Sequence, residues 1–303
     1  MNKTMNEQNY WSQYWAQGNI TSFTDIYANG YEGIIAKIWQ DKFNTISENQ
    51  SVLDLCTGSA SIIRLAKSKI PNFQMINFTG VDYAQELNVE DFSIYKNVEL
   101  LSKINIEELP FENNSFDHVI SNFGIEYSDI EKSIAEAIRV GKPTAKYHFI
   151  CHHHESNILN DNSRLLACLN EMNIDGGVLH YLSLLIDLLE SKTDESEHIR
   201  NKLNQRLGLL AEKDIDSFHT SRVVEFIKHI LNPKVINKSL VLDSFKSDLD
   251  SHSKRLAHLK NSALNSNKIL LIKSLFDANG ISNVDVGTIE DKGNLVAFKI
   301  EVS

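Results

Sequence analysis

The chain contains 303 residues, of which 42% are hydrophobic and 23% are charged, and its formal net charge is −10. This length and composition are typical of a globular protein with one large domain, or with one domain that carries a sizeable insertion. Proteins that bind nucleic acid normally present a face rich in lysine and arginine, so the acidic balance argues against a nucleic-acid partner.

Three features of the sequence predict a cytoplasmic protein. The N-terminus lacks the basic-then-apolar pattern of a secretory signal. No apolar run approaches the roughly 20 residues that a membrane helix needs, so no membrane partner is expected. The cysteines Cys56, Cys151 and Cys168 form no CxxC pair and are expected to be free thiols in a reducing compartment.

From about residue 50 to residue 154, short β-type runs alternate with helical ones. Helical patterns fall at Ser61–Lys69 and Asp129–Val140. Strands that alternate with helices predict a doubly wound α/β fold with a mainly parallel sheet. The predicted strands are Ser51–Cys56, Met75–Val81, Val98–Ile104, His118–Asn122 and Lys146–His152.

The first predicted strand leads into a turn of small residues, in the run SVLDLCTGSAS of residues 51–61. Strand, small-residue turn and helix is the order in which a doubly wound domain holds a nucleotide. Asp54 lies inside the apolar strand, and Gly58 is the one glycine of the turn. Asp82 follows the second strand, where such folds place an acid for a ribose diol. These residues predict a cofactor site at one edge of the sheet.

A long helical segment, residues 155–262, interrupts the strand pattern. Within it, Val178–Glu190 is apolar nearly all round and is expected to be deeply buried or in an interface. Other runs carry apolar stripes at helical spacing. We expect these faces to need the rest of the chain, or a second copy, to cover them. The insertion is therefore predicted to be a lid over the substrate or a homodimer interface.

The strand pattern returns after a helix at Ser266–Asn279, which Gly280 is placed to end. Two further runs, Val284–Glu290 and Asn294–Val302, predict an antiparallel hairpin on the otherwise parallel sheet.

These patterns divide the chain into two predicted parts. Residues 1–154 and 263–303 form the α/β domain, and residues 1–48 are its N-terminal helical cap. Residues 155–262 form the helical insertion after the fifth strand.

The motifs, in this order, resemble those of the class I S-adenosylmethionine-dependent methyltransferases that act on small molecules. VLDLCTGSAS resembles the family's acidic strand and glycine-rich loop, and GVDYAQ resembles its second motif. INIEELPFENNSFDHVISNFGIEYSD resembles the run through the third and fourth strands, and YWSQYWAQGNITSF resembles the leading helix over the cofactor. Relative to the usual loop, Cys56 and Ala60 replace the first and third glycines. The resemblance covers about residues 10–154 and 266–303, and it implies a Rossmann-like fold.

The resemblance implies that S-adenosyl-L-methionine is the cofactor. Asp54 would hold its ammonium region, Gly58 would pass beneath it, and Asp82 would accept both ribose hydroxyls. A glycine-poor loop is compatible with this ligand, because it has no pyrophosphate that the backbone must approach.

Four further residues are implied in cofactor binding by their positions in the motifs. Asn105 would bind the adenine amine, although aspartate is more usual there, and Ile106 would form an apolar wall. Asn122 would face the methionine portion. Trp15, in the aromatic N-terminal run, would contact the ligand.

The candidate general bases are histidine and glutamate residues after the fourth and fifth strands. Adjacent residues on a strand point to opposite faces, so His152, His153 and His154 cannot all bind one metal ion, and no metal is expected. Histidine titrates nearest neutral pH, which favours it as the base. We predict His153 as the base, with Glu126 as the alternative. The alternative, purely structural interpretations are a solvated strand end for the three histidines and a cap of the following helix for Glu126.

The substrate-binding candidates are Tyr127, His152 and Trp11. The function that this sequence predicts is in-line methyl transfer to a small-molecule acceptor with a hydrophobic part. Three different functions stay open: a catalytically inactive S-adenosylmethionine-binding protein with an interaction insertion, a protein methyltransferase and an RNA methyltransferase. A nicotinamide dehydrogenase is least compatible with one loop glycine.

Overall fold

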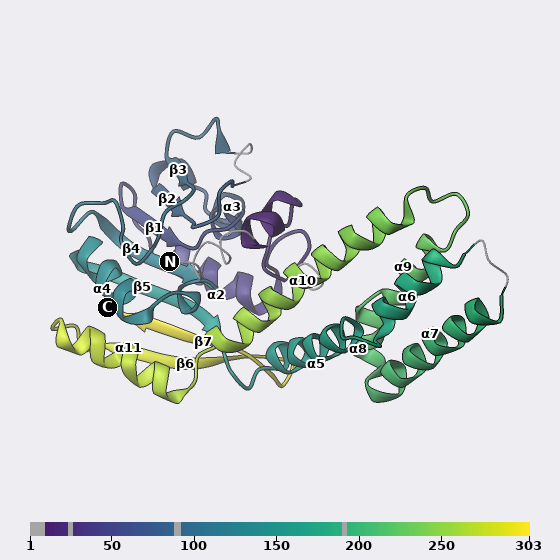
Figure 1. The fold of residues 1–303 in the computed structure, drawn as a ribbon. Coiled ribbons are helices and arrows are strands. Elements are labelled where there is room, and N and C mark those ends of the chain that lie inside the picture. Colours follow the sequence, from purple (N-terminus) through teal and green to yellow (C-terminus); the bar gives the residue numbers. More distant parts are fainter. Residues whose placement is uncertain (1–9, 24–26, 88–91, 190–192) are drawn as a thin grey trace. The chain divides into compact units, whose positions relative to one another are not determined.

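The structure is a computed structural model that describes residues 10–23, 27–87, 92–189 and 193–303. The chain divides into two compact units (Figure 1). The first, here called the sheet unit, comprises Met1–Asn157 and Asn261–Ser303. The second, the helical unit, comprises Ile158–Lys260.

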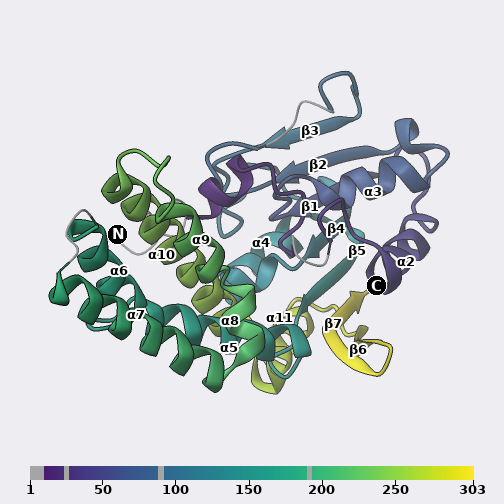
Figure 2. The same ribbon diagram turned by 90° about the vertical axis from the view of Figure 1, so that its right-hand side faces the viewer.

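The described part of the sheet unit contains a seven-stranded sheet in the order β3-β2-β1-β4-β5-β7-β6 (Figure 2). Strands β1 to β5 pair in parallel, and β7 is antiparallel to both β5 and β6. The predicted doubly wound sheet with an antiparallel C-terminal pair is therefore confirmed. The strands are β1 (Ser51–Leu55), β2 (Asn77–Val81), β3 (Val98–Leu101), β4 (Phe116–Asn122), β5 (Gly141–His152), β6 (Val284–Asp291) and β7 (Asn294–Val302).

Helices cover both faces of this sheet. On one face, α4 packs beside α11 over a core that includes Leu53, Leu55 and Phe149. On the other face, α2 packs beside α3, and Trp39 of α2 contacts the ring of His148. Neighbouring residues of a strand point to opposite faces, as His148 and Phe149 do here. The helices and 3-10 turns are α2 (Gly33–Phe43), α3 (Ser61–Lys69), η1 (Phe73–Met75), η3 (Ile125–Tyr127), α4 (Ile130–Val140) and α11 (Ser266–Ala278).

The order of the strands reverses between β1 and β4. The connections from β1 lead outward through β2 to β3, and those from β4 lead the other way. In open α/β sheets, ligands bind beyond the carboxyl ends of the strands at such a reversal. The turn after β1 and the segment after β4 therefore mark the expected site.

Several strand predictions differ from the structure at their ends. β3 ends at Leu101 and not at Ile104, and β4 begins at Phe116 and not at His118. β5 begins at Gly141 and not at Lys146, because Gly141 pairs with Phe116 at the start of β4; the register then shifts before Lys146 pairs with His118. β2 begins at Asn77, because Phe73–Met75 forms a 3-10 turn. The helix predicted before Gly280 does end there, and Gly280 adopts a φ of 78°.

The helical unit has a hydrophobic core of its own. Its buried cluster includes Leu169, Leu182, Leu203, Ile230 and Leu249. The expectation that these helices need another part of the chain, or a second copy, to cover their apolar faces is therefore wrong for the cluster residues. The helices are α5 (Asn157–Met172), α6 (Val178–Asp187), α7 (Asp194–Lys213), α8 (Ile215–Thr220), α9 (Val223–Ile230) and α10 (Lys238–Ser262).

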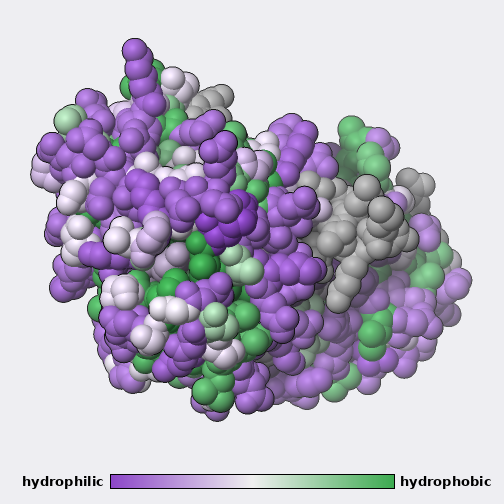
Figure 3. All heavy atoms as spheres, turned by 90° about the vertical axis from the view of Figure 1, so that its left-hand side faces the viewer, coloured by the Kyte–Doolittle hydropathy of each residue, from purple (hydrophilic) through white to green (hydrophobic). Residues whose placement is uncertain are grey.

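Hydrophilic side chains predominate on the molecular face drawn in Figure 3, with smaller hydrophobic patches between them. Among the described residues, none of the helices combines the length and the apolar character that a membrane span requires.

Candidate functional site

The turn after β1 is held in a tight conformation by its own side chains. Thr57 donates a hydrogen bond from Oγ1 to the carboxylate of Asp54 over 2.6 Å. Gly58 adopts a φ of 54° and donates its backbone N–H to Asp82 Oδ2 over 2.8 Å. A left-handed φ is strained for most residues, so glycine suits this position. The turn thus joins the two predicted acidic residues.

Asp82 lies directly after β2 and is buried, at 8% exposed. Its Oδ1 accepts the backbone N–H of Ala84 over 2.9 Å, and its Oδ2 accepts that of Gly58. Burial raises the pKa of Asp82, while these backbone bonds oppose the increase. Each carboxylate oxygen can accept a second hydrogen bond. The side chain is therefore fixed in place and retains capacity for two ligand hydroxyls.

Asp54 is 2% exposed, and burial raises its pKa to about 7, with a smaller contribution from the charge of Asp82. The hydrogen bond from Thr57 acts in the opposite direction. A cationic ligand group near Asp54 would favour the ionised carboxylate and lower this pKa again.

Asn122, the last residue of β4, is held by α2. Its Oδ1 accepts the indole N–H of Trp39 over 2.8 Å. Its Nδ2 is buried and has no hydrogen-bond partner among the described residues. Such an atom is costly to bury alone, so the side chain carries an open donor at the end of β4.

The aromatic N-terminal segment covers the β1 turn. A Cβ atom added at Gly58 would lie 2.6 Å from the Trp15 ring, so this indole packs directly on the turn. Ser59 donates from Oγ to the carbonyl of Asn19 over 2.6 Å, which fastens the segment there. Trp15 stacks on Trp11 with ring centroids 5.9 Å apart, and Trp11 meets the edge of Tyr127 at 5.5 Å.

The predicted adenine residues lie in the segment after β3. Its backbone is tied to Asp82, because Ile104 donates its N–H to the Asp82 carbonyl over 2.9 Å. Asn105 is exposed, and its Oδ1 accepts the N–H of Glu107 over 3.0 Å. Ile106 is 4% exposed and belongs to the core of the sheet unit. Asn105 thus directly follows the residue that bonds to the Asp82 backbone, whereas the side chain of Ile106 packs in the hydrophobic core of the sheet unit.

Glu126 of η3, which follows β4, and His152, the last residue of β5, form a buried pair. Glu126 Oε1 accepts two hydrogen bonds from His152, from the backbone N–H over 2.8 Å and from ring Nδ1 over 2.7 Å. Both side chains are 0% exposed. The sequence singled out both residues but did not predict that they pair.

The structure does not bring His153 together with this pair. Its ring lies against Phe298 of β7, with centroids 4.1 Å apart, and its Nδ1 accepts the N–H of Glu155 over 3.0 Å. Burial lowers its pKa. Strand alternation explains the difference, since His152 and His153 point to opposite faces. The structure therefore places His152, and not the predicted His153, beside Glu126.

Sequence reasoning missed three aromatic side chains around His152 and Asn122. Phe23 and Phe123 lie 5.3 Å and 4.7 Å from the His152 ring, centroid to centroid. Tyr31 contacts Phe123 at 6.2 Å. The available signal was the aromatic N-terminal run, which continues past Trp15 through Phe23 to Tyr31.

These residues fit S-adenosylmethionine. The ligand offers a ribose diol, an ammonium and a carboxylate, and the site offers two buried carboxylates and an open amide donor. Asp82 would hold the ribose and Asp54 the ammonium region, with Asn122 at the methionine portion. Because Trp15 packs on Gly58, a bound ligand would have to meet or displace this ring.

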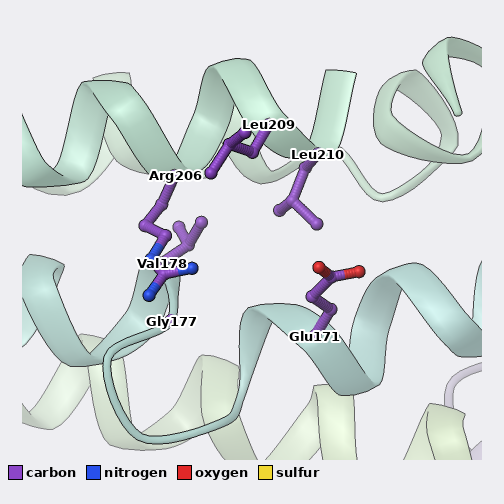
Figure 4. Close-up of a pocket in the computed structure, with 6 residues that line it drawn as sticks. All are labelled: Glu171, Gly177, Val178, Arg206, Leu209 and Leu210. Atoms are coloured by element: carbon purple, nitrogen blue, oxygen red, sulfur yellow. The ribbon is translucent and has the colours of Figure 1, made fainter. Parts of the chain in front are cut away.

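The helical unit carries a separate small pocket, which no sequence motif predicted (Figure 4). Lys213 donates to the Glu171 carboxylate over 2.6 Å, so the acid of this pocket is paired. Among the residues that the structure describes, no group of three or more His, Cys, Asp or Glu side chains could hold a metal ion. The pocket is lined by Glu171, Gly177, Val178, Arg206, Leu209 and Leu210.

Comparison with known proteins identifies relatives of the sheet unit. The model of the ubiE/COQ5 methyltransferase family matches residues 31–164. The ubiquinone/menaquinone biosynthesis C-methyltransferase UbiE of Rickettsia prowazekii (strain Madrid E) is 34% identical over 125 residues, which cover 38% of this chain and 49% of the relative. The enzyme of the same name from Rickettsia bellii (strain OSU 85-389) matches to the same extent. The chain thus spans about half the length of the curated relatives it matches.

A solved structure, a SAM-dependent methyltransferase from Aquifex aeolicus, covers 96% of this chain and 97% of its own. Its sequence identity is 13% and its TM-score is 0.46. The family match ends within α5, so nearly all of the helical unit lies beyond it. The match to residues 31–164 agrees with the predicted resemblance to the class I methyltransferases, and it supports S-adenosyl-L-methionine as the cofactor.

Proposed function

We propose that this protein transfers a methyl group from S-adenosyl-L-methionine to a small-molecule acceptor. The observation that carries the proposal is the convergence of Asp54, Asp82 and Asn122 at the carboxyl ends of β1, β2 and β4. The family match to residues 31–164 supports it.

The sheet unit would contribute mainly binding, alignment and exclusion of water. The cofactor, when bound, supplies an electrophilic methyl group on its sulfonium. Asp82 would fix the ribose, and Asp54 would offset the charge of the ammonium. The rings of Trp15 and Trp11 would limit access of water to the site. Holding two reactants in line removes much of the entropic barrier to such a displacement.

The names of the relatives favour carbon as the methylated atom and a quinone precursor as the acceptor class. Both matched Rickettsia proteins are C-methyltransferases of ubiquinone and menaquinone biosynthesis. An acceptor of this class has the hydrophobic part that the sequence predicted. The aromatic side chains Phe23, Phe123 and Tyr127 near the ends of β4 and β5 are compatible with a planar ring.

The helical unit has two proposed roles, closure over the acceptor and formation of a homodimer. Light scattering tests the second, because a stable dimer has twice the chain mass. Hydrogen exchange along α10 tests the first, because closure would slow exchange when cofactor product and acceptor are both present. A monomer with unchanged exchange would contradict both roles.

The activity test uses S-adenosylmethionine with a deuterated methyl group. The probes are reduced 1,4-naphthoquinone as a carbon acceptor and catechol as an oxygen acceptor, and mass spectrometry detects the label in the product. Labelled naphthoquinone is the expected result. Binding of S-adenosylhomocysteine without transfer to either probe would instead favour a catalytically inactive binding protein. Label in a protein fraction would favour a protein methyltransferase, and label in an RNA fraction would favour an RNA methyltransferase.

A further inference from the structure

We propose that His152 is the general base of the methyl transfer and that Glu126 positions it. This inference rests on the proposed function, because it assigns the residue that takes the acceptor's proton. It differs from the sequence prediction, which chose His153.

The position of the Glu126 carboxylate decides which nitrogen of His152 carries the proton. A single carboxylate oxygen, Glu126 Oε1, lies 2.8 Å from the His152 backbone nitrogen and 2.7 Å from ring Nδ1. An ionised carboxylate only accepts hydrogen bonds, so Nδ1 must be the donor. In the neutral ring the other nitrogen, Nε2, then has a free lone pair. The pair divides its roles as an acid and a histidine do in a catalytic triad.

The other ring nitrogen of His152, Nε2, lies among aromatic side chains. It is buried and has no hydrogen-bond partner among the described residues. The rings of Phe23, Phe123 and Tyr127 surround the imidazole, with centroids 5.3, 4.7 and 5.7 Å away. Aromatic walls leave a buried acceptor atom unsatisfied, which is costly unless a ligand group bonds to it. An O–H group on a planar acceptor supplies both the hydrogen bond and the apolar contact.

The Glu126–His152 pair is connected to the turn after β1 by side-chain contacts. A chain of aromatic contacts runs from Gly58 through Trp15 and Trp11 to Tyr127, whose ring meets His152 edge-on. In the sheet, Asn122 pairs with Ile150, two residues before His152, so their side chains share one face. The histidine therefore lies on the side of the sheet that carries the open donor of Asn122.

Methyl transfer with His152 as the base needs only the cofactor and the acceptor as reactants. His152 Nε2 takes the proton from the acceptor hydroxyl, and the electron pair so released makes a neighbouring ring carbon, or the oxygen itself, the nucleophile. The new bond to the methyl carbon forms as the carbon–sulfur bond breaks, and that electron pair stays on sulfur. The products are methylated acceptor, S-adenosylhomocysteine and a His152 imidazolium paired with Glu126. The imidazolium then returns its proton to water.

The other two histidines of the run lack this arrangement. His153 faces Phe298, and its Nδ1 already accepts the Glu155 N–H. His154 lies beside the Leu264 carbonyl, 3.1 Å from Nδ1, and its side chain is 39% exposed. His153 is therefore a matched control, because it is adjacent in sequence and points the other way.

The test combines a spectroscopic readout with turnover. Nitrogen-15 NMR of histidine in the S-adenosylhomocysteine complex reports the tautomer of His152, assigned by its loss in His152→Gln. We expect the Nδ1–H form in the natural protein, and its loss in Glu126→Leu. With reduced 1,4-naphthoquinone as the probe, His152→Gln should lower kcat by roughly 10²–10⁴-fold, and Glu126→Gln should also lower it, while His153→Gln keeps it near the natural value. Calorimetry with S-adenosylhomocysteine checks that each variant is folded and binds normally.

Three outcomes would overturn the assignment: an Nε2–H tautomer in the natural protein, undiminished turnover in His152→Gln, or an equal loss in His153→Gln. Absence of turnover in the natural protein, with either probe, would count against the proposed function instead. The tautomer would still decide whether His152 presents a free Nε2.

Discussion

The sheet unit and the helical unit differ in what their buried residues do. The core of the sheet unit contains charged and polar side chains at strand ends, including Asp54, Asp82, Glu126 and His152. The buried cluster of the helical unit is made of apolar residues from α5 to α10. Burying a carboxylate costs free energy unless a partner or ligand compensates it. Among the described residues, the sheet unit therefore buries carboxylate and imidazole groups that need partners, whereas the buried polar side chains of the helical unit are the uncharged Ser196 and Ser217.

The largest expected effect tests whether the helical core is an independent source of stability. Leu182 is 0% exposed within that core, so Leu182→Ala should lower the free energy of unfolding of this unit by about 2–5 kcal/mol. Affinity for S-adenosylhomocysteine should not change. Denaturant unfolding and calorimetry measure the two quantities. The control is Leu240→Ala, at a position that is 68% exposed. If Leu182→Ala lowered the affinity for S-adenosylhomocysteine as much as it lowers the stability, the difference between the two units would not hold.

The second effect concerns the ribose-binding acid of the sheet unit. Asp82→Ala removes a carboxylate that can accept two ligand hydroxyls, so binding of S-adenosylhomocysteine should weaken by roughly 1.5–3 kcal/mol. Asp248→Ala replaces an exposed aspartate of α10 and should leave binding unchanged. Unchanged affinity in Asp82→Ala, measured by titration calorimetry, would remove Asp82 from the ribose site.

The third effect is a pH dependence confined to the sheet unit. Burial raises the folded-state pKa of Asp54 to about 7, above its unfolded value of 3.8. Its contribution to stability is therefore fully present below the unfolded pKa and is lost as the pH rises through about 7. Cofactor binding has the opposite sign, because a cationic ligand group favours the ionised carboxylate. Affinity for S-adenosylhomocysteine should be about tenfold weaker at pH 6 than at pH 8, or about 1.4 kcal/mol. Asp54→Asn should bind weakly at both pH values, and a natural protein with flat affinity would contradict the assignment.

The smallest effect compares one helix N-terminus in each unit. Thr193 caps α7 by accepting the N–H of Ser196, and Asn265 caps α11 by accepting that of Lys268. Replacing either cap with alanine should cost about 1 kcal/mol. Hydrogen exchange should show that each substitution loosens its own unit. Loosening of both units by either substitution would mean that they unfold together.

Much of the sheet could be predicted because its strands are short apolar runs between clear turn signals. β1, β4 and β7 follow such runs within a few residues. β5 was predicted five residues too short, because Gly141 and Pro143 resemble a turn in sequence. The pairing of Gly141 with Phe116, with which the strand begins, is a contact that only the folded sheet creates. The turns at Gly58 and Gly280 could also be predicted, because glycine is typical of positions with positive φ, and both residues adopt it.

The candidate site could be predicted in its residues but not in its pairings. Asp54 and Asp82 follow motifs whose order and spacing are readable. The orientation of His152 depends on the register of β5 with β7, in which His152 pairs with Ala297, a residue far away in the sequence. Apolar and polar residues do not alternate clearly around His152, so the local sequence could not show whether His152 or His153 faces the site. The bond between Glu126 and His152 is likewise a contact that only the folded sheet creates.

Titration calorimetry of the natural protein with S-adenosylhomocysteine and, separately, with NAD tests the cofactor assignment. We expect one molecule of S-adenosylhomocysteine to bind per chain and NAD not to bind, because the β1 turn and Asp82 suit a ribose without a pyrophosphate. Binding of NAD, or no binding of S-adenosylhomocysteine, would contradict this assignment.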